Sequence, residues 1–250
     1  MFKKVSVFNF SGIYDEESFY LKDKGSFFCD ALSIEKYDLQ NISGTNCMCD
    51  DNALSEIRRV IKDNNISSGE VHYIDSGNYH YMSAILTEDI KTPFSLVVLD
   101  HHPDMQPPLF GNILSCGGWV LDVIENNKFL KDVHIIGADR QLIEKLDKKD
   151  AERVNFYDTD ELDKVHPQYP VYLSIDKDVL SKKFIVTNWD QGEMSKEELF
   201  SFVKKIMTGH ELIGVDICGE CAIDQEGCDL GIEIEKNDSF NLNILKVILC

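Results

Sequence analysis

The chain has 250 residues, of which 43% are hydrophobic, so it can bury one large core, and we expect a single domain over residues 1–250. Its formal net charge of −19 repels phosphate backbones, which argues against a nucleic-acid partner, and favours cations such as metal ions or guanidinium groups. No stretch approaches the ~20 apolar residues of a membrane span and no cleavage signal follows the first residues, so we expect a cytoplasmic protein without a membrane partner.

Short runs rich in Val, Ile and Tyr alternate with helical stretches along the chain. This pattern is typical of a mostly parallel sheet that is covered by helices on both faces, which is the three-layer α/β/α sandwich. The predicted strands are 5–10, 71–75, 94–100, 133–137, 154–157, 171–176 and 212–217.

Three amphipathic segments are predicted to be helices. In the segment 52–62 the apolar side chains recur at helical spacing. Ser195 and Glu198 form the capping box of a second helix, and the tail 239–249 is the third.

The eight cysteines, without a secretion signal, are predicted to be reduced thiols. Cys218, Cys221 and Cys228 have a C-x2-C-x6-C spacing that could form part of a structural zinc site, and Cys47 with Cys49 form a C-x-C. Two paired clusters at finger-like spacing are absent, so we favour small core residues and a few exposed thiols.

Charged and histidine side chains follow several of the predicted strands, at the edge where parallel sheets bind ligands. Asp100, His102 and Asp104 follow the run 96–99, and Asp176 and Asp178 follow 172–175. His80 comes shortly after the strand 71–75, and Asp216 and Glu220 follow 213–215.

Each of these pieces alone has an ordinary explanation as a turn, a helix cap or a core histidine. Together they place several carboxylates at one buried edge, where unpaired charges cost several kcal/mol. Two divalent cations would offset that cost. Because carboxylate oxygens and imidazole nitrogens make up the set and no thiolate is among them, manganese suits it better than a closed thiolate zinc site does.

Two of these blocks resemble the ureohydrolase family, which contains arginase and agmatinase and shares its fold with histone deacetylases. LDHHPD at 99–104 resembles the family's D-A-H-x-D block, LSIDKDVL at 173–180 resembles its S-x-D-x-D block, and GNYHY at 77–81 stands where the family has its first histidine ligand. The resemblance covers residues 70–220. It implies an arginase-like fold with two divalent ions, for which we expect Mn²⁺, on six ligands: His80, Asp100, His102, Asp104, Asp176 and Asp178.

The resemblance further implies how the ligands are shared between the two ions. Asp100 and Asp176 would bridge them. The first ion's set would be completed by His80 and Asp104, and the second's by His102 and Asp178.

Other family positions differ in this chain. GNILSCGGW at 111–119 has Cys116 where the family has the histidine that shuttles protons, and Gln106 stands where arginase has an asparagine that helps hold its amino acid substrate. Glu220 lies one residue later than the family's guanidinium partner. In TNWDQGEMS, Trp189 and Asp190 would give the pocket a different lining.

The expected activity is hydrolysis of a C–N bond in a guanidino or related amidine substrate, through a metal-bridging hydroxide, with urea or an analogue as product. Asp104 would relay the proton, with Cys116 as a poor shuttle and Glu220 as a contact of the substrate cation. The substrate would be a small molecule or a peptide, and assembly as a homo-oligomer is left open. The alternatives are a deacetylase-like amide hydrolase and a non-catalytic relative that has kept its metals.

Overall fold

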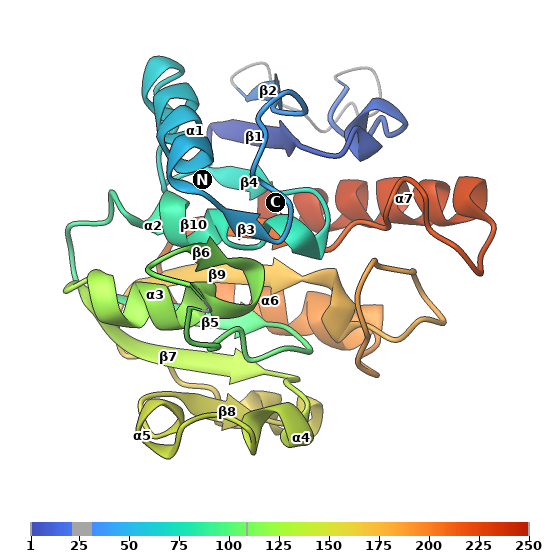
Figure 1. Cartoon of the computed structure of the whole chain (residues 1–250). Helices are drawn as coiled ribbons and strands as arrows, with labels where there is room; N and C mark the ends of the chain where they lie inside the picture. Colours follow the sequence, from blue (N-terminus) through green and yellow to red (C-terminus); the bar gives the residue numbers. More distant parts are fainter. Residues whose placement is uncertain (1, 22–31, 109, 250) are drawn as a thin grey trace.

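The computed structural model describes residues 2–21, 32–108 and 110–249 (Figure 1). Within these residues, eight strands form one sheet in the order β2-β1-β4-β10-β9-β5-β7-β8, and every neighbouring pair is parallel. The strands are β1 (Lys4–Asn9), β2 (Ser33–Asp38), β4 (Val71–Tyr73), β5 (Phe94–Leu99), β7 (Leu130–Ile136), β8 (Asn155–Tyr157), β9 (Val171–Asp176) and β10 (Leu212–Cys218). A separate antiparallel pair joins β3 (Met48–Cys49) to β6 (Leu114–Ser115).

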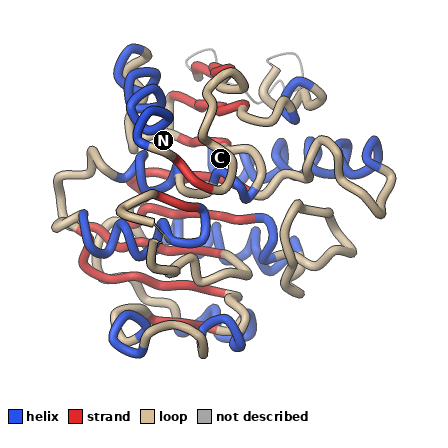
Figure 2. The backbone as a smooth tube through the Cα atoms, in the orientation of Figure 1, coloured by secondary structure: helices blue, strands red, loops and turns tan. Residues whose placement is uncertain are grey.

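Helices cover both faces of this sheet, as the tube in Figure 2 also shows. The α-helices are α1 (Asp51–Asp63), α2 (Met82–Thr87), α3 (Trp119–Asn126), α4 (Arg140–Ile143), α5 (Lys148–Ala151), α6 (Lys196–Gly209) and α7 (Leu230–Leu249). One core packs α6 and α7 on one face, and a second core packs α1, α2 and α3 on the other. Alternate residues of one strand enter opposite cores, as Val97 and Val98 of β5 do. The predicted three-layer sandwich with a mostly parallel sheet is confirmed.

The seven predicted strands are all present, and the capping box of Ser195 and Glu198 begins α6. One helix boundary and one strand differ from the prediction. Helix α7 begins at Leu230 rather than at Ser239, and β2 was missed because four of its six residues are polar or charged. Strand β2 is an edge strand that pairs with β1 alone, and such strands need no buried apolar face. No helix among the described residues is both long and apolar enough to cross a bilayer.

Candidate metal centre

The predicted ligands meet at the carboxyl edge of the sheet, where β4, β10, β9 and β5 lie side by side. Asp100 directly follows β5, and Asp176 is the last residue of β9. Asp178 lies in the 3-10 turn η6 (Lys177–Val179), and His80 follows the turn η3 (Gly77–Tyr79). Because parallel strands end at the same edge of a sheet, segments that lie far apart in the sequence converge there.

His80 lies in the most buried part of this cluster. Its Nδ1 atom is 3.2 Å from Asp100 Oδ2, 3.2 Å from Asp104 Oδ2 and 3.3 Å from Asp176 Oδ2. Burial by itself lowers the pKa of His80, but the adjoining carboxylates of Asp100, Asp104 and Asp176 outweigh burial and raise it. An imidazole surrounded by three carboxylate oxygens is therefore held protonated unless another cation takes the place of that proton.

The other ring nitrogen of His80 is fixed by the interior of the sheet. Ser174 Oγ lies 2.9 Å from His80 Nε2 and donates its own hydrogen to Asp216 Oδ1 at 2.6 Å. The serine oxygen is thus the acceptor for an Nε2 proton, which leaves Nδ1 as the atom that faces the carboxylates. This arrangement of a buried carboxylate behind a histidine is the one that orients histidines toward metal ions.

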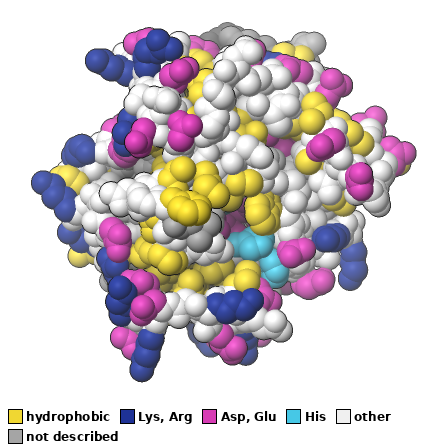
Figure 3. All heavy atoms as spheres, in the orientation of Figure 1, with side chains coloured by type: hydrophobic (Ala, Val, Ile, Leu, Met, Phe, Trp, Pro, Cys, Tyr) yellow, Lys and Arg dark blue, Asp and Glu magenta, His cyan; other side chains and the backbone are white. Residues whose placement is uncertain are grey.

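His102 forms a second and more open half of the cluster. Its Nδ1 atom is 2.8 Å from Asp178 Oδ2 and 3.6 Å from Asp100 Oδ1, and its side chain is 21% exposed against 2% for His80. Burial lowers the pKa of His102, but hydrogen bonds with Asp100 and Asp178 outweigh burial and raise it to about 12. Figure 3 shows histidine atoms reaching the surface beside hydrophobic side chains.

The four aspartates are between 1% and 8% exposed. Asp100 Oδ2 has no hydrogen-bond partner. Burial, followed by the charges of Asp178 and Asp100, raises the pKa of Asp176 well above its usual range. The cluster therefore concentrates negative charge that the two imidazoles offset only in part, and its oxygen and nitrogen donors suit divalent cations.

Potential ligand atoms form three groups, and within each group the atoms lie no more than 4.8 Å apart. The groups are His80, Asp100 and Asp104; Asp100, His102 and Asp178; and His80, Asp176 and Cys218. The structure thus brings all six predicted ligands together and places Asp100 in two groups. How they are divided between ions stays a prediction. Cys218 is a further member of these groups that the sequence did not indicate, because its cysteine spacing was interpreted as that of small core residues and thiols.

Two neighbours set the positions of the carboxylates. Trp119 donates its indole N–H to Asp104 Oδ2 at 2.7 Å, and its ring centroid lies 4.8 Å from that of His80. Gly219 has φ +92°, and a Cβ atom there would lie 2.4 Å from Asp176 Oδ1. A residue without a side chain is required at this point for Asp176 to keep its place.

The structure places Glu220 in a different environment. This carboxylate is fully buried, lies 2.5 Å from the ammonium of Lys177, and accepts hydrogen bonds from Tyr14 and Asn241. The resemblance implies that Glu220 contacts substrate. Its partners are instead residues on the face of the sheet that α7 covers.

Cys116 and Trp189 lie beside the cluster. The backbone N–H of Cys116 donates to Cys47 O at 2.9 Å, and burial, with the charge of Asp104, raises the pKa of its thiol. Trp189 is 40% exposed, its ring centroid is 5.8 Å from that of His102, and its indole N–H donates to Asn78. The open half of the cluster is therefore bordered by an aromatic surface.

Comparison with known proteins identifies both a relative and a fold. No family model matches the chain. An uncharacterized protein of Thermotoga maritima is 30% identical over 218 residues, which are 86% of this chain and 79% of that protein.

Two solved structures match nearly the whole chain. Proclavaminate amidino hydrolase of Streptomyces clavuligerus has a TM-score of 0.68 and 15% identity, with 100% of this chain and 93% of its own covered. Agmatine ureohydrolase of Thermoplasma volcanium has a TM-score of 0.67 and 12% identity, with 99% and 89% covered. At these identities the likeness concerns the fold, which is that of the arginases.

Proposed function

We propose, from the premise that this chain belongs to the family of the Thermotoga maritima protein and has the arginase-like fold, that it is a binuclear metal-dependent hydrolase. The proposed reaction cleaves a C–N bond of a guanidino or related amidine substrate and releases urea or an analogue together with an amine. The observation that carries the proposal is His80 Nδ1, which lies within 3.3 Å of oxygens from three separate carboxylates.

The donor set supports two divalent ions, for which we propose manganese because four of the six predicted ligands are aspartates and the other two are histidines. One ion would be held by His80 and Asp104 and the other by His102 and Asp178, with Asp100 and Asp176 between them. Such ions lower the pKa of a bound water to about 7 and so supply hydroxide at neutral pH.

Asp104 is the residue that we propose for proton transfer. The indole N–H of Trp119 fixes its carboxylate at 2.7 Å, so one oxygen keeps a constant direction relative to His80. In that position Asp104 would take a proton from the attacking water and return it to the leaving amine. Cys116 is unsuited to the task, because its raised pKa keeps the thiol protonated at neutral pH.

Two features favour a cationic substrate. The chain carries a net charge of −19, and Trp189 offers a partly exposed indole beside His102. A planar guanidinium group can stack on such a ring while the surrounding negative field attracts it. Glu220 has no part in this proposal, because Lys177 already neutralises it.

The test is urea release from a panel of guanidino compounds with added manganese: arginine, agmatine, guanidinobutyrate and arginine within peptides. We expect urea release from at least one of them. The matched control is Asp178→Asn, which should be inactive. Absence of release from every compound would refute the guanidino claim, and acetate release from acetylated lysine or polyamines would point to an amide hydrolase.

A further inference from the structure

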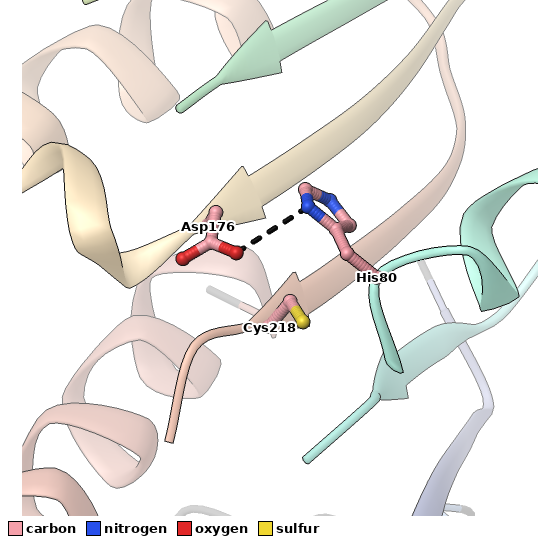
Figure 4. Close-up of side chains that lie close together, drawn as sticks. All are labelled: His80, Asp176 and Cys218. Carbon is pink, nitrogen blue, oxygen red and sulfur yellow. Dashed lines mark ion pairs between the residues drawn. The ribbon is translucent and has the colours of Figure 1, made fainter. Parts of the chain in front are cut away.

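Cys218 is the last residue of β10 and pairs directly with Asp176, the last residue of β9. Figure 4 shows the two side chains at neighbouring strand ends, with His80 approaching from the turn that follows β4. One ligand atom from each of the three residues lies within 4.8 Å of the other two. The register of two parallel strands therefore delivers a sulfur atom to the His80 half of the cluster.

The ordinary explanation for a fully buried cysteine is that it packs as a small apolar side chain. Cys218 does contact a backbone oxygen, since its Sγ lies 3.3 Å from Ser76 O. Cys218 belongs to the apolar core that α1, α2 and α3 cover, but its Sγ atom also lies within 4.8 Å of a ring nitrogen of His80 and a carboxylate oxygen of Asp176, which are two predicted ligands. A second observation points to a cation at this place: the buried Asp100 Oδ2, 3.2 Å from His80 Nδ1, has no hydrogen-bond partner.

The distances are close to those around one ion. A zinc-like ion lies about 2.3 Å from sulfur and about 2.0–2.2 Å from nitrogen or oxygen, so a sulfur and an oxygen bound to it are at most roughly 4.5 Å apart. The three atoms here are within 4.8 Å, which small side-chain movements would reduce to that range. The His102 half differs, since its group consists of Asp100, His102 and Asp178 and includes no sulfur.

We propose that Cys218 is a ligand of the ion bound on the His80 side, which gives that position a sulfur, nitrogen and oxygen donor set. This inference rests on the proposed metal centre and makes its two positions chemically different. A thiolate ligand favours softer ions such as zinc or cobalt over manganese, whereas the His102 side keeps oxygen and nitrogen donors alone. As the ion binds, it replaces the thiol proton, which passes to solvent.

The experiment adds Co²⁺ or Cd²⁺ stepwise to the metal-free protein and records the near-ultraviolet band that arises from charge transfer between thiolate and metal. We expect the band to rise with the first equivalent in the wild-type protein and to be lost in Cys218→Ser. It should persist in Cys221→Ser, where the cysteine is equally buried, and in Cys116→Ser, where the thiol lies near Asp104. In competition, Cys218→Ser should lose on the order of tenfold or more of the preference for zinc over manganese.

The outcomes separate this inference from the proposed function. If calorimetry shows that the ion binds but no thiolate band forms, or if the band persists in Cys218→Ser, the sulfur ligand is refuted and the metal centre stands. If no ion binds to the wild-type protein, the metal centre itself is refuted. Cys218→Ala provides the same comparison should the serine variant fail to fold, and the wild-type spectrum needs no variant.

Discussion

The chain buries carboxylates in two places near the same sheet edge, and the two clusters are neutralised differently. In the metal cluster, the ion-pair partners of the four aspartates are the imidazoles of His80 and His102. In the second cluster, Glu220 pairs with the ammonium of Lys177, which is fully buried and also donates to Asn237 and Asn241. Burial and the charge of Glu220 raise the pKa of the neighbouring Glu17 well above its usual range. The second cluster thus contains its own permanent cation.

The two clusters are joined by a single turn of chain. Lys177 lies between Asp176 and Asp178, and its ammonium bonds to residues of α7 while its two neighbours join His80 and His102. We infer from this difference that the Lys177 cluster is structural and that the cluster around His80 and His102 can bind an ion. A buried carboxylate next to lysine is satisfied by folding alone, whereas carboxylates next to histidine leave room for a metal ion.

The largest effect is expected from Asp176→Asn, which removes one charge from the metal cluster. We expect metal content, measured by elemental analysis after loading with manganese, to fall by on the order of tenfold or more, because a shared ligand is lost. Glu220→Gln makes the same chemical change in the second cluster and should leave the metal content unaltered. Equal metal content in Asp176→Asn and wild type would contradict the role of this aspartate.

The second prediction concerns Lys177→Met. Removing the ammonium leaves Glu220 buried without its cation, so the free energy of unfolding should fall by roughly 3–5 kcal/mol in urea denaturation. The loss should have the same size with and without manganese. Adding Glu220→Gln to this variant should recover part of it, and Lys183→Met at the exposed Lys183 serves as the control. A loss that manganese reverses would show that the two clusters are not separable.

The smallest expected effect concerns His72 and the loss of stability at acidic pH, which is measured apart from metal binding. Burial lowers the pKa of His72, a residue of β4, from 6.5 to about 4, although its hydrogen bond to Ser67 O opposes this. Between pH 4 and pH 6.5 the imidazole of His72 binds a proton in the unfolded chain but not in the folded one. The free energy of unfolding therefore falls by about 3 kcal/mol as the pH decreases from 6.5 to 4.

His72→Gln keeps a donor for Ser67 O and removes the titrating group. In metal-free protein, its free energy of unfolding should decrease less than that of the wild type over this pH range. The measurement is urea denaturation at several pH values. Identical pH profiles for the two proteins would show that His72 does not contribute, and the remaining acid sensitivity would then belong to the two carboxylate clusters.

The sequence predicted those parts of the molecule that local patterns determine. Apolar runs that end in Asp100 or Asp176 located both the strands and the edge at which the ligands meet. The residues that were missed act through contacts between strands. Ser174 is such a residue: it lies inside the buried strand β9, and only the pairing of β9 with β10 makes it a partner of Asp216, which the sequence had indicated as a candidate.

Cys218 and Glu220 also have neighbours that their positions in the sequence did not predict. The spacing of Cys218 suggested a site with other cysteines, but the strand register places it beside Asp176. Glu220 was expected to contact substrate, yet Lys177, which lies 43 positions earlier, takes its charge. Spacing along the chain carries no information about which face of the sheet a side chain reaches after a turn.

The positions of the two tryptophans give the protein an internal optical reporter. Trp119 is fully buried against His80, whereas Trp189 is partly exposed beside His102. A shielded indole emits at shorter wavelengths than a hydrated one, and paramagnetic ions such as Mn²⁺ quench nearby emission. Quenching at the blue edge of the fluorescence spectrum would therefore report an ion on the His80 side, near Trp119. Quenching at the red edge would report an ion on the His102 side, near Trp189.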